Sequence, residues 1–469
     1  MLALMALCLS LGHAVVIGFD FGSTFFKITL VKPGQPFAIV ENTATKRKTE
    51  TMLTLLPDEA RIFGADSFME QSKYPKTSFH SLHRFVGLSA EDESLPALLK
   101  ERYVMTEIEP DERGLVGWKV QRQLHRNGSE PLEEIVYTEE LIGHLFKHGR
   151  QMAERQAGGG TTVKDCVITV PAYFTYAQRR MLLDAADIAG LSVLQLVHEN
   201  TAAATMFGID RLDKEKPVTV LFYNMGGSDT EVSLVRYSTI TEMPANKTFE
   251  HVEVLAEAWD AQLGSSKLDG VLIDLLAERF NEQKERQGKR DVRENPKAAK
   301  RLQKEVLKIK DVLSANKQIQ VKLGELEDYD SLTTTVHRAE FEEKSQDFFS
   351  RVLAPIEAVL AKAGLTAEEV DIVEMLGGGI RVPRVQELLA ERFGAEKELG
   401  VHLNGDEAMC FGSAFIGSNS SASFKVRKVY LTQHPLEALQ IRISPANESK
   451  VQQASTGSEE ESDEETEDV

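Results

Sequence analysis

Cysteine is scarce in this sequence. Only Cys8, Cys166 and Cys410 occur among 469 residues. Three cysteines are too few for a disulfide framework, and their spacing matches no zinc motif, so Cys166 and Cys410 are expected to be buried thiols. Apolar stretches of about 18 residues, which a membrane-spanning helix requires, are also missing, and the apolar N-terminal segment is shorter than this. The sequence therefore predicts no membrane span.

Basic residues are outnumbered. Lys and Arg total 54 against 73 Asp and Glu, which gives a formal net charge of −19. A surface of this charge repels nucleic acid and anionic membranes, so we expect no nucleic-acid partner. The last twelve residues, SEEESDEETEDV, contain eight of the acidic residues. This block has almost nothing apolar to bury, which predicts a short disordered acidic tail that solvates the protein rather than a docking site.

The first fourteen residues, MLALMALCLSLGHA, are apolar but too short to span a bilayer. They are typical of the hydrophobic region of a signal peptide, with cleavage expected near Ala14, although no positive residues precede it. A buried first strand is the alternative. Acceptor sequons for N-glycosylation, at Asn127, Asn246, Asn419 and Asn447, suit a secretory route.

Length and composition favour a large globular body. A hydrophobic fraction of 42% supports a sizeable core, and because single cores stop growing near roughly 250 residues, one large two-lobed domain or two to three ordinary domains are expected. The stretch SNSSAS, residues 418–423, is typical of a linker. Residues 418–469 are thus expected to stand apart from the body.

Two stretches share one pattern of strand, glycine-containing turn and strand. They are VVIGFDFGSTFFKITLV, residues 15–31, and the segment 218–235, which contains NMGGSD. Each is followed by a predicted helix, from 138 with Thr138 as N-cap, and from 267. The repeat indicates an internal duplication into two α/β lobes with a cleft between them.

Three further segments place polar and glycine residues at the ends of regular elements. A strand at 165–174 precedes a helix that Gly190 terminates, and a long helix begins at Asn295 and Pro296 and carries Lys310 and Ser314 on one face. Residues 371–393 read as strand, glycine-rich loop and helix. Backbone N–H groups of such loops can bind a phosphate.

Six segments occur in a fixed order along residues 15–417: IGFDFGST, CVITVPAYFTYAQRR, HENTAAA, the turn at 224–231, LGGGIRVP and NGDEAMCFGSA. They resemble the ATPase domain of the heat-shock protein 70 superfamily. The resemblance implies an α/β, two-lobed, actin-like (ribonuclease H-like) fold. It also implies lobe I at about 15–210 and 380–417, and lobe II at about 211–379.

The segment SASFKVRKVYLT, residues 421–432, resembles the large endoplasmic-reticulum members of this superfamily, the hypoxia-up-regulated, glucose-regulated 170 kDa class. This resemblance implies the endoplasmic reticulum lumen as location, a lumenal heat-shock protein 70 chaperone as partner, and unfolded polypeptide as a further ligand. A peptide-binding β-sandwich and a helical lid are expected after the ATPase domain. Only a stub and the acidic tail follow, so the chain resembles a form truncated after that domain.

The resemblance also implies ATP and Mg²⁺ as cofactors. Asp20 matches the carboxylate that orients metal-bound water, and Glu199 matches the carboxylate near the attacking water. Phosphate and nucleoside contacts are implied for a set of residues from both lobes: Gly22, Ser23, Thr24, Gly226, Gly227, Lys310, Ser314, Gly378, Gly379, Arg381 and Asp406.

Three positions depart from the family pattern. Asn224 stands where the family has Asp, Asp229 where it has a hydroxyl residue, and His83 where it has a catalytic lysine. A neutral amide attracts Mg²⁺ less than a carboxylate, and a carboxylate repels a γ-phosphate. Taken singly, His83 reads as an ordinary histidine, and Asn224 as a residue that still holds a metal-bound water. Together the changes predict weak or absent ATP hydrolysis.

The leading hypothesis is an ATP-binding chaperone that promotes nucleotide exchange on a lumenal partner. The alternatives are a small-molecule kinase or hydrolysing ATPase of the same fold, and a structural, actin-like polymer former. The family-specific segments VPAYF and ENTAAA weigh against a kinase, and the net charge weighs against self-association.

Overall fold

A computed structural model describes residues 15–57, 60–101, 104–122, 132–211, 216–244, 246–394, 397, 399–420, 424 and 426–433. The predicted signal peptide, the acidic tail, Asn127 and Asn447 lie outside these residues. The described residues belong to one unit that ends at Gln433. No helix among them is both long and apolar enough to cross a membrane.

The first sheet grows from the predicted hairpin at 15–31. Strands β1 (Val16–Phe21) and β2 (Phe25–Val31) pair antiparallel, and β1 also pairs in parallel with β11 (Asp165–Val170), which pairs in parallel with β12 (Ser192–His198). Two short strands, β3 (Ala38–Ile39) and β4 (Thr49–Glu50), pair with β2. Strand β1 is buried along its whole length, because a sheet with helices on both faces requires apolar residues on both.

The second sheet repeats this arrangement. Strands β13 (Val218–Met225) and β14 (Thr230–Glu242) form the second hairpin, and β13 pairs in parallel with β18 (Ile372–Leu376), which pairs with β19 (Leu399–Gly400). On the other side, β15 (Lys247–Asp260) and β20 (Val429–Gln433) complete the sheet. The predicted duplication is confirmed: each sheet centres on a hairpin whose first strand pairs in parallel with a later strand.

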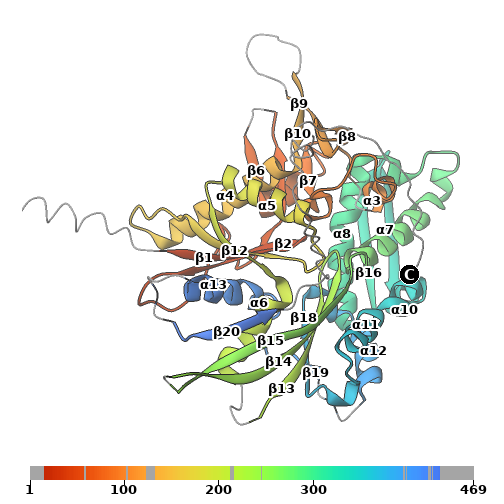
Figure 1. Ribbon diagram of the computed structural model, residues 1–469. Coiled ribbons are helices and arrows are strands. Elements are labelled where there is room, and N and C mark those ends of the chain that lie inside the picture. Colours follow the sequence, from red (N-terminus) through yellow and green to blue (C-terminus); the bar gives the residue numbers. More distant parts are fainter. Residues whose placement is uncertain are drawn as a thin grey trace, which may run out of the picture. The chain divides into compact units, whose positions relative to one another are not determined.

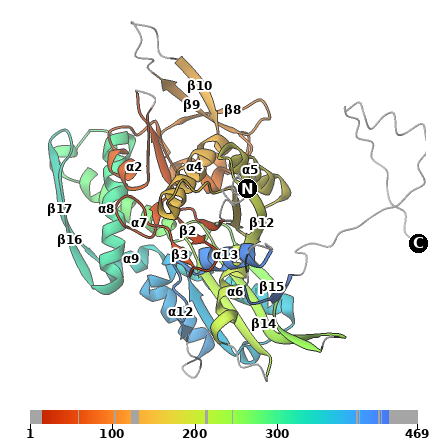
Figure 2. The same ribbon diagram turned by 90° about the vertical axis from the view of Figure 1, so that its left-hand side faces the viewer.

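Helices α6 (Glu199–Arg211) and α13 (Ala408–Ser420) lie between the two sheets (Figures 1 and 2). On one side they pack in a cluster with Val167 and Val197 of the first sheet. On the other side they pack in a second cluster with Phe222 and Tyr237 of the second sheet. This shared helical layer joins lobe I, built on the first sheet, to lobe II, built on the second, and confirms the predicted two-lobed α/β fold.

The outer face of each sheet carries its own helices. The core of lobe I includes residues of α4 (Thr138–Ala157) and α5 (Tyr176–Ile188). The core of lobe II includes four helices: α7 (Ser266–Asn281), α8 (Pro296–Ala315), α11 (Ala354–Ala363) and α12 (Pro383–Phe393). Each core therefore lies on the side of its sheet that faces away from the shared helices.

Smaller elements extend the two lobes. Lobe I carries two three-stranded sheets, β6-β5-β7 and β10-β9-β8, and lobe II a two-stranded sheet, β16-β17. Their bounds are β5 Met52–Leu55, β6 Arg61–Phe63, β7 Ser78–His80, β8 Glu107–Pro110, β9 Val116–Arg122, β10 Leu132–Tyr137, β16 Gln318–Glu327 and β17 Asp330–His337. The remaining helices are α2 (Gly64–Glu70), α3 (Leu95–Glu101), α9 (Arg338–Lys344) and α10 (Gln346–Arg351).

Helix ends follow the predicted chemistry at two places and differ at one. The Asn295 side chain accepts hydrogen bonds from the first turn of α8, and Gly190 adopts φ +70° just after α5, as predicted. The prediction that Thr138 caps α4 is wrong. Thr138 lies inside the helix, where its buried hydroxyl donates to the Val116 carbonyl and accepts from Trp118 Nε1.

The lobe boundary differs from the one predicted at 379–380. Helix α12 packs in the core of lobe II, and β19 pairs with β18, so residues 380–400 belong with lobe II. The stretch predicted as a linker from 418 begins inside α13, and β20 extends the second sheet beyond it. Pairing between distant strands decides both boundaries. Cys166 and Cys410 are buried free thiols, as predicted.

Glycine permits the close approach of α13 to its neighbours, which gives a first prediction. A Cβ at Gly412 would lie 1.8 Å from the Ala202 carbonyl oxygen of α6. We expect Gly412→Ala to lower the free energy of unfolding by about 2 kcal/mol, because the two helices must separate. Urea unfolding followed by circular dichroism measures this change.

The matched control is Gly270→Ala in α7, where an added Cβ meets nothing within 4 Å. Alanine is favoured over glycine within a helix, so this variant should gain about 0.5 kcal/mol. Equal unfolding midpoints for the two variants would contradict the packing of α13 on α6.

Candidate functional site

A cavity of about 390 Å³ opens between the lobes, a size typical of small-molecule sites. Both hairpin turns, helix α8 and the loop after β18 line it. The predicted site residues that line it are Asp20, Gly22, Ser23, Thr24, His83, Glu199, Asn224, Gly226, Gly227, Asp229, Lys310, Ser314, Gly378, Arg381 and Asp406. Gly379 does not: it is buried against Met225 in the short 3₁₀ helix Gly378–Arg381.

The two hairpin turns meet at the base of this cavity. A Cβ at Gly227 would lie 2.2 Å from Thr24 Oγ1 and 3.0 Å from Ser23 Oγ, so the approach requires glycine. The third glycine loop joins them, since a Cβ at Gly377, whose φ is +81°, would lie 2.3 Å from the Met225 carbonyl oxygen. Three backbone turns from distant parts of the chain therefore border one space, an arrangement suited to an anionic ligand.

Asp20 is almost completely buried at the end of β1 and is not free. It accepts a hydrogen bond from Thr169 Oγ1 at 3.1 Å, and Lys27 Nζ lies 2.6 Å from its other oxygen. Burial lowers the pKa of Lys27, but the adjacent Asp20 carboxylate outweighs this and raises the pKa above its ordinary value. Sequence reasoning missed Lys27. Its signal was a single charge within the apolar strand FFKITLV.

Glu199 and Asn224 contact each other across the lobes. Asn224 Nδ2 donates to Glu199 Oε2 at 3.1 Å. Burial raises the pKa of Glu199 well above its usual range, and the nearby carboxylates of Asp229 and Asp20 raise it further. An Asp at 224 would add another negative charge here, so the amide suits the acidic surroundings.

Glu231 is a second buried carboxylate that the sequence did not reveal. One oxygen accepts from the Ala172 backbone N–H at 2.7 Å. Burial first, then Glu199 and Asp229, raise its pKa well above the usual range. Asp229 accepts a 2.5 Å hydrogen bond from Tyr173 Oη, which belongs to the VPAYF segment. Asp229 is thus bonded to lobe I as well as facing the cavity.

His83 is buried and neutral. It lies in the 3₁₀ helix Leu82–Phe85 between the rings of Phe21 and Phe174, with centroids 5.9 and 4.9 Å away. Neither ring nitrogen has a hydrogen-bond partner among the described residues. Burial, aided by the charge of Arg84, lowers its pKa to about 3. At pH 7 this position therefore carries no charge, unlike a lysine.

Arg84, the neighbour of His83, was also missed. Its guanidinium extends from lobe I to lobe II, where it donates to the carbonyl oxygens of Ser228 (3.2 Å) and Ala261. Ser228 belongs to the second hairpin turn. This contact fixes the cavity wall at that turn.

The opposite end of the cavity is formed by α8 and the loops of lobe II. Lys310 pairs with Asp269 at 2.6 Å, and Asp406 pairs with Arg381 at 2.8 Å and Lys48 at 3.5 Å. Leu307 and Asp311, one turn either side of the predicted Lys310 and Ser314 face, also line it. The i, i+3, i+4 spacing of a helix could have identified them.

These residues fit a nucleotide better than a metal ion held by the protein. Backbone turns, cations and two unpartnered imidazole nitrogens border the cavity. Within the described ranges, however, no group of three or more His, Cys, Asp or Glu side chains is arranged to hold a metal. Asp20 already faces Lys27, so a metal here depends on phosphate and water oxygens.

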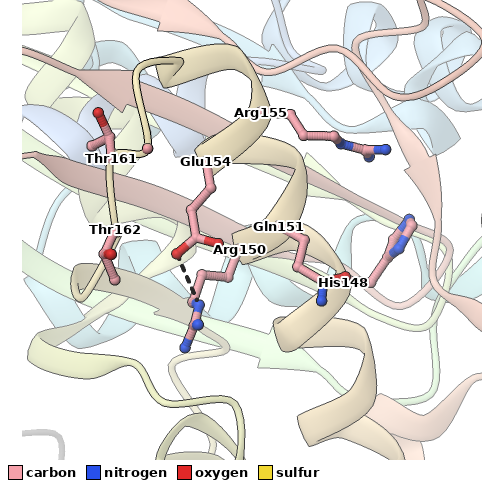
Figure 3. Close-up of a pocket in the computed structure, with 8 residues that line it drawn as sticks. His148, Arg150, Gln151, Glu154, Arg155, Thr161 and Thr162 are labelled. Atoms are coloured by element: carbon pink, nitrogen blue, oxygen red, sulfur yellow. Dashed lines mark ion pairs between the residues drawn. The ribbon is translucent and has the colours of Figure 1, made fainter.

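A second hollow, of about 630 Å³, runs along the outer side of α4 (Figure 3). Its side chains serve the fold. Arg150 donates to the Ala189 carbonyl at 2.7 Å and pairs with Glu154 at 3.2 Å. The His148 ring stacks on the Phe63 ring, with 4.5 Å between the ring centroids. The interlobe cavity, which gathers the predicted residues, is therefore the candidate site.

Comparison with known proteins agrees with this geometry. Residues 16–464 match the family described as "Hsp70 protein". "Hypoxia up-regulated protein 1" of Danio rerio is 35% identical over 439 residues, or 93% of this chain and 43% of the relative. The proteins of that name from Xenopus tropicalis and Homo sapiens are each 35% identical, over 92% and 88% of this chain and 64% and 40% of the relatives.

The chain thus spans less than two thirds of the length of these relatives. The match covers both lobes and every segment that borders the cavity. It confirms the resemblance found in the sequence: the chain belongs to the heat-shock protein 70 family.

Proposed function

We propose that this chain binds ATP in the interlobe cavity and acts as a chaperone-type regulator with weak or absent ATP hydrolysis. One observation carries the proposal: two glycine turns from different lobes meet beside a buried histidine without charge. Members of this family bind ATP with Mg²⁺. Asp20 would orient the water around a Mg²⁺ ion that arrives with the nucleotide.

The weak hydrolysis follows from the charge of the site. Phosphoryl transfer needs positive charges beside the transferred phosphoryl group, and hydrolysis also needs a positioned water. Neutral His83 supplies no charge, and Asp229 adds a carboxylate beside the second turn. Burial and the nearby carboxylates raise the pKa of Glu199, which disfavours the ionised form that a general base needs. The site is thus better suited to holding ATP than to cleaving it.

ATP then serves as a structural ligand. A ligand that contacts both lobes stabilises the closed arrangement by mass action. The surface so fixed promotes nucleotide exchange on a conventional heat-shock protein 70 chaperone, and unfolded polypeptide is a further ligand of this class. The apolar residues 1–14 and the sequons support the endoplasmic reticulum lumen as location.

A small-molecule kinase or a hydrolysing ATPase of the same fold is the second candidate function. The neutral histidine at 83 disfavours this function, because it supplies no charge for phosphoryl transfer. ATP consumption that depends on an added sugar or acetate would support it.

Binding of ATP is the first prediction of this proposal. Calorimetry with the full chain should show one site for Mg·ATP. Gly227→Val should weaken binding by about tenfold or more, because the side chain clashes with Thr24 Oγ1 and separates the turns. Gly324→Val, at a strand position with open space around it, is the control. Equal affinity in both variants would contradict the site.

Slow hydrolysis of ATP is the second prediction of this proposal. Removing one charge-stabilising group from such a site costs on the order of a hundredfold in turnover. The variant His83→Lys with Asn224→Asp and Asp229→Thr restores the family pattern and should release phosphate faster than the wild type in a single-turnover assay. A wild-type rate equal to that of the triple variant would show that these residues do not limit the reaction.

Nucleotide exchange on a partner chaperone is the third prediction of this proposal. Release of labelled ADP from a lumenal heat-shock protein 70 chaperone should accelerate when the chain and ATP are added together. Gly227→Val, which we expect to bind ATP poorly, should give less acceleration. Unchanged release at saturating protein, with ATP binding confirmed, would remove the exchange role and leave the binding site intact.

A further inference from the structure

Lys27 stands opposite Asp20 on the first hairpin. The two residues are directly paired in the antiparallel register of β1 and β2, and their side chains form the 2.6 Å ion pair in the cavity. The exposed fraction of the Lys27 side chain is 13%, and that of Asp20 is 3%. A buried lysine needs a counter-charge, and here Asp20 supplies it.

The ammonium group lies beside the first hairpin turn. A Cβ at Gly22 would lie 3.9 Å from Lys27 Nζ. The charge of Lys27 also acts on Glu199 and Asp406, on other sides of the cavity. Lys27 therefore lies within the site, beside the first hairpin turn.

The other cations that line the cavity are Lys48, Lys310 and Arg381. Lys310 pairs with Asp269, while Lys48 and Arg381 share Asp406. His83 is neutral. Lys27 and Lys48 both lie near the first turn, since Lys48 Nζ is 4.8 Å from the centre of the Phe25 ring. Lys27 is the more buried of the two, with 13% of its side chain exposed against 38%.

We propose that Lys27 is a built-in cation for the terminal phosphates of the bound nucleotide, and that it replaces part of the charge that Mg²⁺ supplies. This inference rests on the proposed function. An ammonium group is a compact point charge that binds phosphate oxygens. Because it also faces Asp20, it competes with a metal for that carboxylate. The affinity for ATP is therefore only weakly dependent on Mg²⁺.

The test compares the dissociation constant of ATP in Mg²⁺ and in EDTA, by calorimetry with the full chain. For the wild type we expect the two values to agree within about threefold. For Lys27→Met, EDTA should weaken binding by about tenfold or more relative to Mg²⁺, because no ammonium remains and Asp20 becomes available. Lys27→Arg keeps the charge and should behave like the wild type.

Lys32→Met is the control. Lys32 directly follows β2 and lies outside the cavity lining, and its ammonium group donates to the Ala157 carbonyl at 3.4 Å. It should leave the ratio of the two dissociation constants unchanged. If Lys27→Met fails to fold because Asp20 is left buried without a counter-charge, the double variant Asp20→Asn/Lys27→Met removes both charges and should show the same dependence on Mg²⁺.

Two results would overturn the inference, and they differ. If the wild type binds ATP only with Mg²⁺, and Lys27→Met or the double variant behaves identically, Lys27 has no role in neutralising phosphate and the proposed function stands. If the wild type binds ATP in neither condition, the proposed function fails as well.

Discussion

The contact between the two hairpin turns is the constraint on which the site depends. Gly227 fits against Ser23 and Thr24 only because it lacks a side chain. Each turn ends the central strand of its own sheet, so bringing the turns together also sets the distance between the lobes. Helices α6 and α13 hold this distance from behind, packed between both sheets. The cavity is thus a consequence of how the repeated halves are joined.

Charge explains what this cavity can do. Two buried carboxylates, Glu199, which lines the cavity, and Glu231, have pKa values well above the usual range. Positive charge at the turns comes from Lys27 rather than from residue 83, where a neutral imidazole lies between aromatic rings. These features underlie the proposal that the site holds bound phosphates and offers little to the transfer reaction.

Local patterns predicted the local structure. The two hairpins, the start of α8 at Asn295 and the end of α5 at Gly190 all follow from residue type and spacing. The failures concern long-range contacts. Thr138 bonds to a strand twenty-two residues earlier rather than capping its helix, and residues 380–400 join lobe II through strand pairing.

The candidate site shows the same division. The predicted site residues line the cavity, apart from Gly379, whereas Lys27, Arg84 and Glu231 were not predicted. Lys27 matters because β1 and β2 pair in one register, and Arg84 because lobe II comes within its reach. No spacing along the chain identifies the contacts of Arg84 and Glu231, whereas the lone charge of Lys27 within FFKITLV was a signal that the sequence offered.

Hydrogen–deuterium exchange with and without ATP tests the central claim, that one nucleotide is held by both lobes. We expect ATP to slow exchange at both hairpin turns, 22–24 and 226–229, and in the loop at 377–381. The slowing should depend on ATP concentration in the same way at all three segments. Protection confined to the turn of one lobe, or absent from both turns at saturating ATP, would contradict it.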